Sequence, residues 1–447
     1  MGESVSRYFA DYAWLGGDQV SDRVLIEVDG ERITSVSAGQ DRPADTIHLP
    51  GVTLPGLANA HSHAFHRALR GRTHRGGGTF WTWREDMYTV AGRLDPDSYH
   101  ALARAVYAEM ALAGITCVGE FHYVHHSPDG TPYPEANALG EALIAAAADA
   151  GIRITLLDTC YLTGGFGVDL HGPQVRFTDG TAAAWADRVE RLAPTRHARI
   201  GAAIHSVRAV PADQLGTVAE WAHDHGAPLH FHMSEQRAEN EACIAAHGCT
   251  PTQLLSEHGA LGSLSTAVHA THLTDDDIAS LAGSHTYVCM APTTERDLAD
   301  GIGRARDLSD AGGLLTLGSD SNAIVDLFEE ARAMELDERL RTECRGHWPA
   351  AELMHAATSD GHASLGWPEA GRIQAGALAD FVTVTLDSVR MAGADAATLL
   401  ESVVFAASAA DVTDVVVGGR RVVEQRRHTQ VTDITAALHD SIRAVVC

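Results

Sequence analysis

The sequence contains no lysine. All 33 residues counted as Lys or Arg are arginines. This absence excludes the chemistry that needs a side-chain ammonium: Schiff bases with carbonyl substrates, attachment of pyridoxal phosphate, and phosphate-loop lysines. It also excludes a carboxylated lysine that bridges two metal ions, so a metal centre in this chain needs other ligands.

Positive charge of any kind is scarce, and the formal net charge of the 447-residue chain is −26. Nucleic acids and anionic membrane surfaces are therefore not expected as partners, because binding phosphate groups takes a basic face. A small acidic substrate stays compatible with this charge if arginines at the site bind it against the overall field.

Cysteines and long apolar runs are also few. The seven cysteines are scattered and form no CxxC pair, which favours reduced thiols over a disulfide framework or a thiolate zinc site. The chain has neither an apolar stretch of about 18 residues nor a secretory leader pattern at its start. These absences predict a cytoplasmic protein, and the hydrophobic content of 45% predicts a globular one.

Both ends of the chain are rich in short β-type runs. These runs occur at 23–36, 371–386 and 412–425. The first of them turns at Asp29 and Gly30, which is a typical hairpin signal. The pattern predicts one small composite β domain that is built from 1–54 and 370–447.

The middle of the chain alternates short apolar strands with longer amphipathic stretches such as 97–114 and 138–151. Eight such units predict an α/β fold, a (β/α)8 TIM barrel over 55–369. A doubly wound sheet is the alternative, but eight units in about 310 residues fit barrel closure better. The eight strand candidates are 52–63, 115–123, 152–160, 199–206, 227–235, 266–273, 286–292 and 314–321.

Each predicted strand begins apolar and ends in polar residues. Because the carboxyl ends of barrel strands form the active-site face, we expect these polar residues around one mouth. They are His61, His63, His122, His205, His232, Glu235, His269 and Asp320.

A subset of these residues has the spacing of a metal site. His61 and His63 close the first strand, where alternation directs both imidazoles to one face and lets them chelate one ion. His232 at the end of strand five can supply a third nitrogen, although His230 is an equal candidate by spacing alone. Asp320 can add an oxygen. Such a set suits zinc with one position left for water, while Fe2+ and Mn2+ accept the same kinds of ligand.

Two further residues indicate hydrolysis. Glu235, three residues after His232, can take a proton from an attacking water and pass it to a leaving nitrogen. A charge at the start of a helix is the structural alternative for this residue. His269 on strand six can polarise a tetrahedral intermediate, or it can be a buried, hydrogen-bonded histidine. With Asp320, these two residues form the predicted catalytic set.

Four motifs of the sequence resemble those of a known family. The motifs LPGLANAHSH, HFHMSE, AVHATHL and LGSDS occur in this order and are similar to those of the amidohydrolase superfamily. The resemblance implies one metal ion per subunit, expected as Zn2+, and it selects His232 over His230. The binuclear branch of that family has a lysine at the end of strand four, whereas this strand ends in His205. The implied ligands are His61, His63, His232 and Asp320.

A narrower resemblance extends across the chain. HSHAF, FWTWRE, GEFHYVHH, PDG, HSVRAV and APTTERDLADG are similar to segments of the N-formimino-L-glutamate deiminases of histidine degradation. This implies zinc-dependent hydrolysis of N-formimino-L-glutamate to N-formyl-L-glutamate and ammonia, a homodimer, and Tyr123 and His205 in the substrate pocket. That family has glutamine where this chain has His66. At a substrate contact, histidine keeps a hydrogen bond but changes the donor pattern.

The implied substrate carries two carboxylates, and an unpaired dianion has a large desolvation cost. Arginine suits bidentate carboxylate binding, and we expect Arg84 and Arg208 on the mouth side, with Trp81 and Trp83 as pocket walls. A related deaminase of guanine- or adenosine-type cyclic amidines is one alternative, but a neutral ring would not need both arginines. A catalytically inactive scaffold is the other, and it would lack stoichiometric metal.

Overall fold

The core of the protein is a parallel eight-stranded barrel. The computed structural model describes residues 5–74 and 80–446, and strands β5 to β12 follow one another in chain order. Neighbouring strands pair in parallel, and a bridge between Ser62 and Asp320 joins the first strand to the segment after the last. The predicted TIM barrel is confirmed. Its strands are β5 (Leu57–Ser62), β6 (Ile115–His122), β7 (Arg153–Cys160), β8 (Ala198–Ile204), β9 (Leu229–Met233), β10 (Ser265–His269), β11 (Tyr287–Met290) and β12 (Leu314–Leu317).

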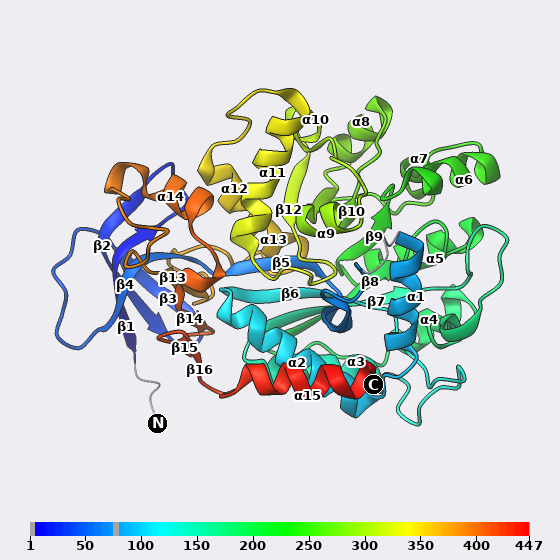
Figure 1. Ribbon diagram of the computed structural model, residues 1–447, viewed down its shortest axis with the longest axis horizontal. Coiled ribbons are helices and arrows are strands. Elements are labelled where there is room, and N and C mark those ends of the chain that lie inside the picture. Colours follow the sequence, from blue (N-terminus) through cyan, green and yellow to red (C-terminus); the bar gives the residue numbers. More distant parts are fainter. Residues whose placement is uncertain (1–4, 75–79, 447) are drawn as a thin grey trace.

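Helices surround this barrel (Figure 1). Local sequence signals set their ends: at the start of α2 the Asp95 carboxylate accepts the backbone N–H of Ser98 at 2.7 Å, and Pro96 occupies the first turn. The predicted helices at 97–114 and 138–151 correspond to α2 and α3. The helices of the barrel region are α1 (Phe80–Ala91), α2 (Pro96–Leu112), α3 (Ala138–Ala150), α4 (Ala182–Val189), α5 (Ala212–Asp224), α6 (Arg237–His247), α7 (Pro251–Glu257), α8 (Asp275–Gly283), α9 (Pro292–Asp297), α10 (Ala305–Asp310), α11 (Leu327–Thr342), α12 (Ala350–Ala357) and α13 (Ser359–Ser364).

A second sheet combines the two ends of the chain. Its strand order is β16-β15-β14-β13-β4-β1-β2-β3, and the antiparallel pairing of β13 with β4 joins the C-terminal strands to the N-terminal ones. In Figure 1 these blue and orange strands lie together at one end of the molecule. A sheet from both chain ends is as expected. Its strands are β1 (Ser6–Trp14), β2 (Val20–Asp29), β3 (Arg32–Ser37), β4 (Ile47–Pro55), β13 (Phe381–Val384), β14 (Val412–Val417), β15 (Arg420–Glu424) and β16 (Arg427–His428).

The run 52–63, expected as one strand, is divided between the two sheets. β4 ends at Pro55 in the second sheet, and β5 begins at Leu57 in the barrel. Gly56 lies at the junction, where an added Cβ would come within 2.2 Å of the Thr116 hydroxyl oxygen. Glycine therefore lets the chain pass from one sheet into the other in tight contact with β6.

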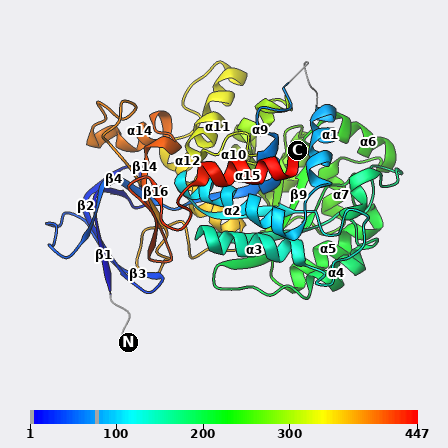
Figure 2. The same cartoon turned by 60° about the horizontal axis from the view of Figure 1, so that its bottom comes forward.

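The C-terminal segment carries two helices, one between β13 and β14 and one after β16, and both pack on barrel helices. α14 (Leu399–Ala406) contacts α11 and α12, and α15 (Ile434–Val446) contacts α2 and α1. Figures 1 and 2 both show α15, in red, lying along α2. The C-terminal segment thus both completes the second sheet and packs on the barrel helices. None of the helices in the described part of the chain combines the length and apolar character that crossing a bilayer demands.

A buried ion pair fixes the second sheet to the barrel. The Arg153 guanidinium at the start of β7 donates to both carboxylate oxygens of Asp380, at 2.7 and 3.1 Å. Asp380 also accepts the backbone N–H of Gly418 at 2.7 Å, and the Arg153 guanidinium lies 5.1 Å from the ring centre of Trp367. Both charges are almost fully buried, so each depends on the other for compensation.

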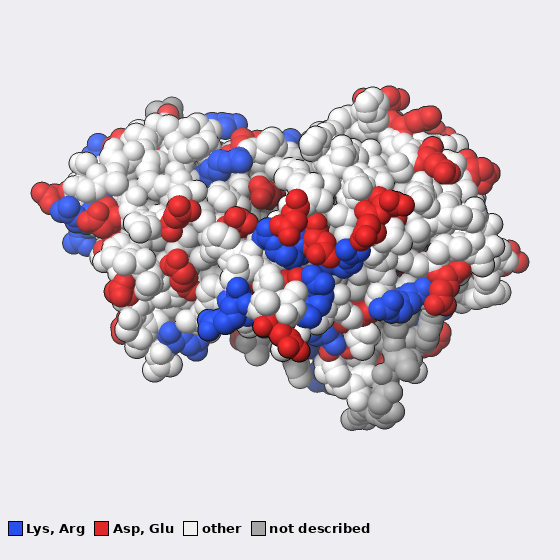
Figure 3. Space-filling view, turned by 90° about the horizontal axis from the view of Figure 1, so that it is seen from above, with Lys and Arg blue, Asp and Glu red and all other residues white. Residues whose placement is uncertain are grey.

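Arginines and carboxylates are interleaved on the face that carries α10 and α11 (Figure 3). Arg304 pairs with Asp307 and Asp275, and Arg341 pairs with Glu338. These two arginines are therefore neutralised locally, which differs from the continuous basic surface typical of phosphate-binding proteins.

Candidate active site

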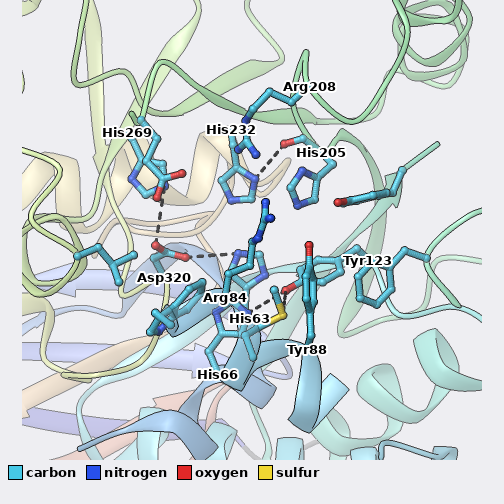
Figure 4. Close-up of a pocket in the computed structure, with 16 residues that line it drawn as sticks. His63, His66, Arg84, Tyr88, Tyr123, His205, Arg208, His232, His269 and Asp320 are labelled. Atoms are coloured by element: carbon cyan, nitrogen blue, oxygen red, sulfur yellow. Dashed lines mark hydrogen bonds and ion pairs between the residues drawn. The ribbon is translucent and has the colours of Figure 1, made fainter. Parts of the chain in front are cut away.

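Three histidines and one aspartate meet at the carboxyl end of the barrel strands. His61 and His63 lie at the end of β5, His232 on β9, and Asp320 after β12. One ligand atom from each residue lies within 4.8 Å of those of the other three. The Nε2 atoms of His61 and His232 are 3.1 Å apart, and each Nε2 of His61 and His63 is 3.4 Å from Asp320 Oδ1. The structure therefore brings all four predicted ligands together, and Figure 4 shows three of them, His63, His232 and Asp320.

The hydrogen bonds behind these imidazoles direct their free nitrogens inward. His63 Nδ1 lies 3.0 Å from the carbonyl oxygen of Phe121, and His232 Nδ1 lies 2.9 Å from that of His205. Because a carbonyl only accepts, each Nδ1 carries the proton and each Nε2 presents a lone pair to the cluster. Burial lowers the pKa of His61, His63 and His232 well below the usual range, and neighbouring histidines lower it further.

Three neutral imidazole nitrogens and one carboxylate oxygen form a donor set that fits a divalent ion such as zinc. Asp320 keeps its charge in this set: burial raises the pKa of its carboxyl, but His269 and the ligand histidines outweigh burial and lower the pKa below the usual value. An anionic oxygen among neutral nitrogens partly compensates the charge of a bound cation. The four residues thus satisfy both the geometry and the chemistry of a metal centre.

The loop that carries Asp320 is bound tightly to the end of β5. The backbone N–H of Asp320 donates to the His61 carbonyl and that of His63 donates to the Asp320 carbonyl, each at 3.0 Å. Asn322 donates from its side chain to the His63 carbonyl at 3.0 Å. Gly318 permits this approach, because a Cβ there would lie 2.8 Å from the His61 carbonyl oxygen. Asp320 itself has φ +41°, a left-handed conformation that indicates strain held by the surrounding contacts.

Glu235 and His269 lie beside the cluster. His269 Nε2 is 3.9 Å from Glu235 Oε1 and 3.8 Å from Asp320 Oδ2. Burial raises the pKa of Glu235, although His269 and Arg208 oppose the shift. For His269, burial lowers the pKa, but Glu235, Glu295 and Asp320 outweigh it and raise the pKa to about 10. A buried carboxyl and an imidazole on opposite sides of one small volume are suited to proton transfer and charge stabilisation.

The predicted substrate residues all line the same pocket (Figure 4). His66 Nε2 lies 2.9 Å from the Tyr123 hydroxyl, and His205 stands where β8 ends. Arg84 comes from α1, and Arg208 follows β8 with its Nε 3.5 Å from Glu239 Oε1. Trp83 also lines the pocket, whereas the side chain of Trp81 lies outside the described residues. Further lining residues that sequence reasoning missed are Met87, Tyr88, Tyr161, Phe177 and Leu298.

Of these missed residues, two had a usable signal. Tyr161 follows the last residue of β7, so the rule that strand ends form the active-site face could have found it. Leu298, at the end of α9, lies in the segment APTTERDLADG of the family resemblance. Met87 and Tyr88 lie within α1, and Phe177 follows a short 3-10 turn. No periodicity in the sequence distinguishes those three from ordinary packing residues.

Two of the histidines considered from the sequence lie away from this site. His122, expected at the mouth, is the last residue of β6, and its neighbour Phe121 contacts the ring of His61. Alternation therefore places His122 on the helix side, where it lies near His125 and Asp158. His230 lies deeper in the barrel than His232, with its Nε2 3.1 Å from the carbonyl oxygen of Ser364.

The chain is similar to several known proteins. A model described as "Amidohydrolase family" matches residues 52–422. Formimidoylglutamate deiminase of Pseudomonas aeruginosa is 38% identical, over 85% of this chain and 86% of that protein. The crystal structure of an amidohydrolase from Brucella melitensis superposes with a TM-score of 0.91 at 33% identity, covering 99% of this chain and 100% of that one. The zinc complex of atrazine chlorohydrolase TrzN from Arthrobacter aurescens TC1 shares the fold, with a TM-score of 0.83 at 24% identity over 98% and 100% of the two chains.

The family model extends across the barrel and part of the second sheet, and these matches confirm the resemblance drawn from the motifs. The family model alone spans more than half of the chain. The chain therefore belongs to the amidohydrolase family and is a hydrolase that acts on carbon–nitrogen bonds.

Proposed function

We propose that the protein hydrolyses the formimino group of N-formimino-L-glutamate, releasing ammonia and leaving N-formyl-L-glutamate. The observation that carries this proposal is one pocket that combines the His61, His63, His232 and Asp320 cluster with two arginines, Arg84 and Arg208. The relative from Pseudomonas aeruginosa, which is named formimidoylglutamate deiminase, supports the same substrate.

We further propose one Zn2+ as the resident ion, held by these three histidines and Asp320. The neutral nitrogens and single carboxylate suit zinc. The structure of atrazine chlorohydrolase TrzN, which has the same fold and was determined as a zinc complex, supports this choice. When bound, zinc supplies a Lewis-acid centre that lowers the pKa of a coordinated water to ~7. Fe2+ and Mn2+ bind the same ligand types, so the proposal includes metal analysis of the purified protein as a direct test.

Glu235 acts as the general base and then as the general acid in this scheme. It takes a proton from the water whose oxygen bonds to the formimino carbon, and it delivers a proton to the nitrogen that departs as ammonia. The second proton of the water leaves its oxygen for the same nitrogen as the bond to that nitrogen breaks, so C=O replaces C=N, both protons end on ammonia, and atoms and charge balance. His269 stabilises the negative charge that develops during addition, because its Nε2 faces the space between Glu235 and Asp320.

The arginines account for a dianionic substrate. A guanidinium can donate two parallel hydrogen bonds to one carboxylate, and Arg84 and Arg208 supply one such group for each carboxylate of the substrate. Tyr123 and His205 extend the polar lining between them. A guanine- or adenosine-type ring carries no carboxylate and would gain nothing from two guanidinium groups in the pocket.

The decisive experiment incubates metal-loaded enzyme with N-formimino-L-glutamate and measures ammonia together with the organic product. We expect ammonia and N-formylglutamate in equal amounts; release of glutamate would instead mean cleavage of the other carbon–nitrogen bond. A His232→Ala variant should lose both metal and activity, whereas His223→Ala, at an exposed histidine, should keep both. Deamination of purine-type amidines with no turnover of the formimino compound would refute the proposal.

The homodimer and the cytoplasmic location remain predictions. Size-exclusion chromatography with light scattering would establish the oligomeric state.

A further inference from the structure

A buried carboxylate lies behind the histidine proposed to stabilise the intermediate. Glu295 is on α9, the short helix after β11, and only 4% of it is exposed. Its Oε1 accepts the backbone N–H of Ala291 at 2.9 Å and lies 3.5 Å from His269 Nδ1. The two nitrogens of His269 thus face opposite ways: Nδ1 towards Glu295, and Nε2 towards Glu235 and Asp320.

The backbone at His269 departs from the regular strand conformation. His269 has φ +70° and Ala270 has φ +49°, so two consecutive residues with side chains take left-handed conformations at the end of β10. Such conformations are costly and persist where surrounding contacts fix them. They also turn the His269 side chain out of the regular strand alternation, so the strand does not by itself determine where the ring points.

The segment that holds Glu295 is firmly anchored. Thr293 donates from its backbone N–H to Glu330 Oε2 at 2.9 Å, and its hydroxyl bonds to the same carboxylate. The Thr294 hydroxyl lies 3.0 Å from the hydroxyl of Ser321 and accepts the Ser321 backbone N–H at 3.2 Å. Ser321 follows Asp320 in the chain. The first turn of α9 therefore contacts both His269, through Glu295, and the loop that carries the proposed aspartate ligand, through Thr294.

We propose that Glu295 is a positioning residue that acts through His269, an inference that rests on the proposed function. Its carboxylate accepts the Nδ1–H of His269, fixes the rotation of the ring, and thereby holds Nε2 towards the reacting group. A carboxylate only accepts hydrogen bonds, so the proton on Nδ1 is assigned by chemistry. Partners of this kind behind a site histidine orient the ring, and at metal sites their loss costs roughly 10–100-fold in function.

The alternative role for Glu295 is structural, because it also accepts the Ala291 N–H within its own helix. Glu295→Gln keeps both contacts, since the amide oxygen can still accept from Ala291 and His269, so the His269→Gln background is what separates the two roles. Glu295→Ala removes both contacts. Arg296→Gln, at the exposed neighbour on the same helix, is the matched control.

The test measures kcat, KM and metal content for each variant, with His269→Gln as a second background. We expect Glu295→Ala to lower kcat by roughly 10–100-fold with KM and metal content little changed, and Glu295→Gln to recover most of the loss. In the His269→Gln background the same alanine substitution should cost less than about threefold, because coupled residues are not additive. An equal loss in both backgrounds, or no loss in either, would overturn the proposal.

A second readout does not depend on the substrate. In metal-loaded protein labelled with 15N-histidine, the Nδ1–H proton of His269, assigned by its absence in His269→Gln, should resonate far downfield. It should move upfield in Glu295→Gln and disappear by exchange in Glu295→Ala. An Nδ1–H signal identical in all three proteins would contradict the proposal even if Glu295→Ala were too unstable for kinetics. If the formimino compound is not turned over but this signal responds, the proposed function fails and the positioning role stands.

Discussion

Replacing Glu235 by glutamine should nearly abolish turnover and leave the metal in place. Glutamine has the shape of glutamate but cannot accept a proton from water. Positioned acid–base groups contribute ~10²–10⁴-fold to rate, so the substitution should raise the barrier by about 2.7–5.5 kcal/mol. The structure favours the upper part of that range for two reasons. Glu235 is buried, and the other carboxylate among the described pocket residues, Asp320, is a proposed metal ligand and so cannot replace it as the base.

Metal retention makes this prediction specific. The four residues whose ligand atoms converge do not include Glu235, so Glu235→Gln should bind the same amount of metal as the parent protein. Glu241→Gln offers a matched control, since this exposed glutamate lies on the helix that follows Glu235. Ammonia release at saturating substrate, with metal measured by plasma mass spectrometry on the same samples, gives both quantities.

The dependence of kcat/KM on pH gives an independent test of the role of Glu235. Burial raises the pKa of Glu235, against the influence of His269 and Arg208. A base must be deprotonated to act, so kcat/KM should fall as pH drops through this raised pKa, above the ordinary carboxyl value of 4.5. The residual activity of Glu235→Gln should lack this acid limb. Near-normal turnover of metal-loaded Glu235→Gln would refute the acid–base assignment.

Three further outcomes are expected. The first is a double variant, Arg208→Met with Glu239→Gln, so that no buried carboxylate is left unpaired. It should raise KM by roughly 10–100-fold, because a charged hydrogen bond to the substrate is lost, while kcat changes less. An unchanged KM for the dianionic substrate would contradict the carboxylate assignment. Burial raises the pKa of Glu120 to about 8, so between pH 4.5, the ordinary pKa, and pH 8 the folded state keeps a proton that the unfolded chain has released. The free energy of unfolding should therefore fall as pH rises through this range, by up to about 1.4 kcal/mol per pH unit. Glu120→Gln should remove this slope in denaturant titrations at pH 5, 6 and 7, and parallel curves for both proteins would show that Glu120 ionises normally. Asp380→Ala should lower the free energy of unfolding by about 3–5 kcal/mol, because it leaves Arg153 buried without a partner. Adding Arg153→Met to the same chain should restore much of the lost stability. If Asp380→Ala alone cost less than about 1 kcal/mol, the role of this ion pair would be contradicted.

The sequence alone determined the barrel and most of the site. Eight apolar runs with polar ends predicted the parallel strands, since a buried strand must be apolar along its length and its carboxyl end faces the active-site mouth. The two-residue period of a strand was enough to place His61 and His63 on one face. The family motifs then selected His232 and Asp320, and the missing lysine excluded a lysine-bridged pair of metals. Each of these conclusions rests on local order along the chain, which the sequence records directly.

Tertiary structure decided whatever depends on depth, on side or on distant neighbours. His230 and His232 share a face of β9, and only their different heights in the barrel separate a residue bonded to Ser364 from a predicted ligand. His122 ends its strand as expected but points to the helices, because the register of β6 gives the inner position to Phe121. Glu295 lies in the segment APTTERDLADG of the family resemblance, but that segment does not show its role, since its contact with His269 joins helix α9 to strand β10. Period and composition describe one element at a time, whereas such contacts arise only when barrel closure brings separate elements to a common rim.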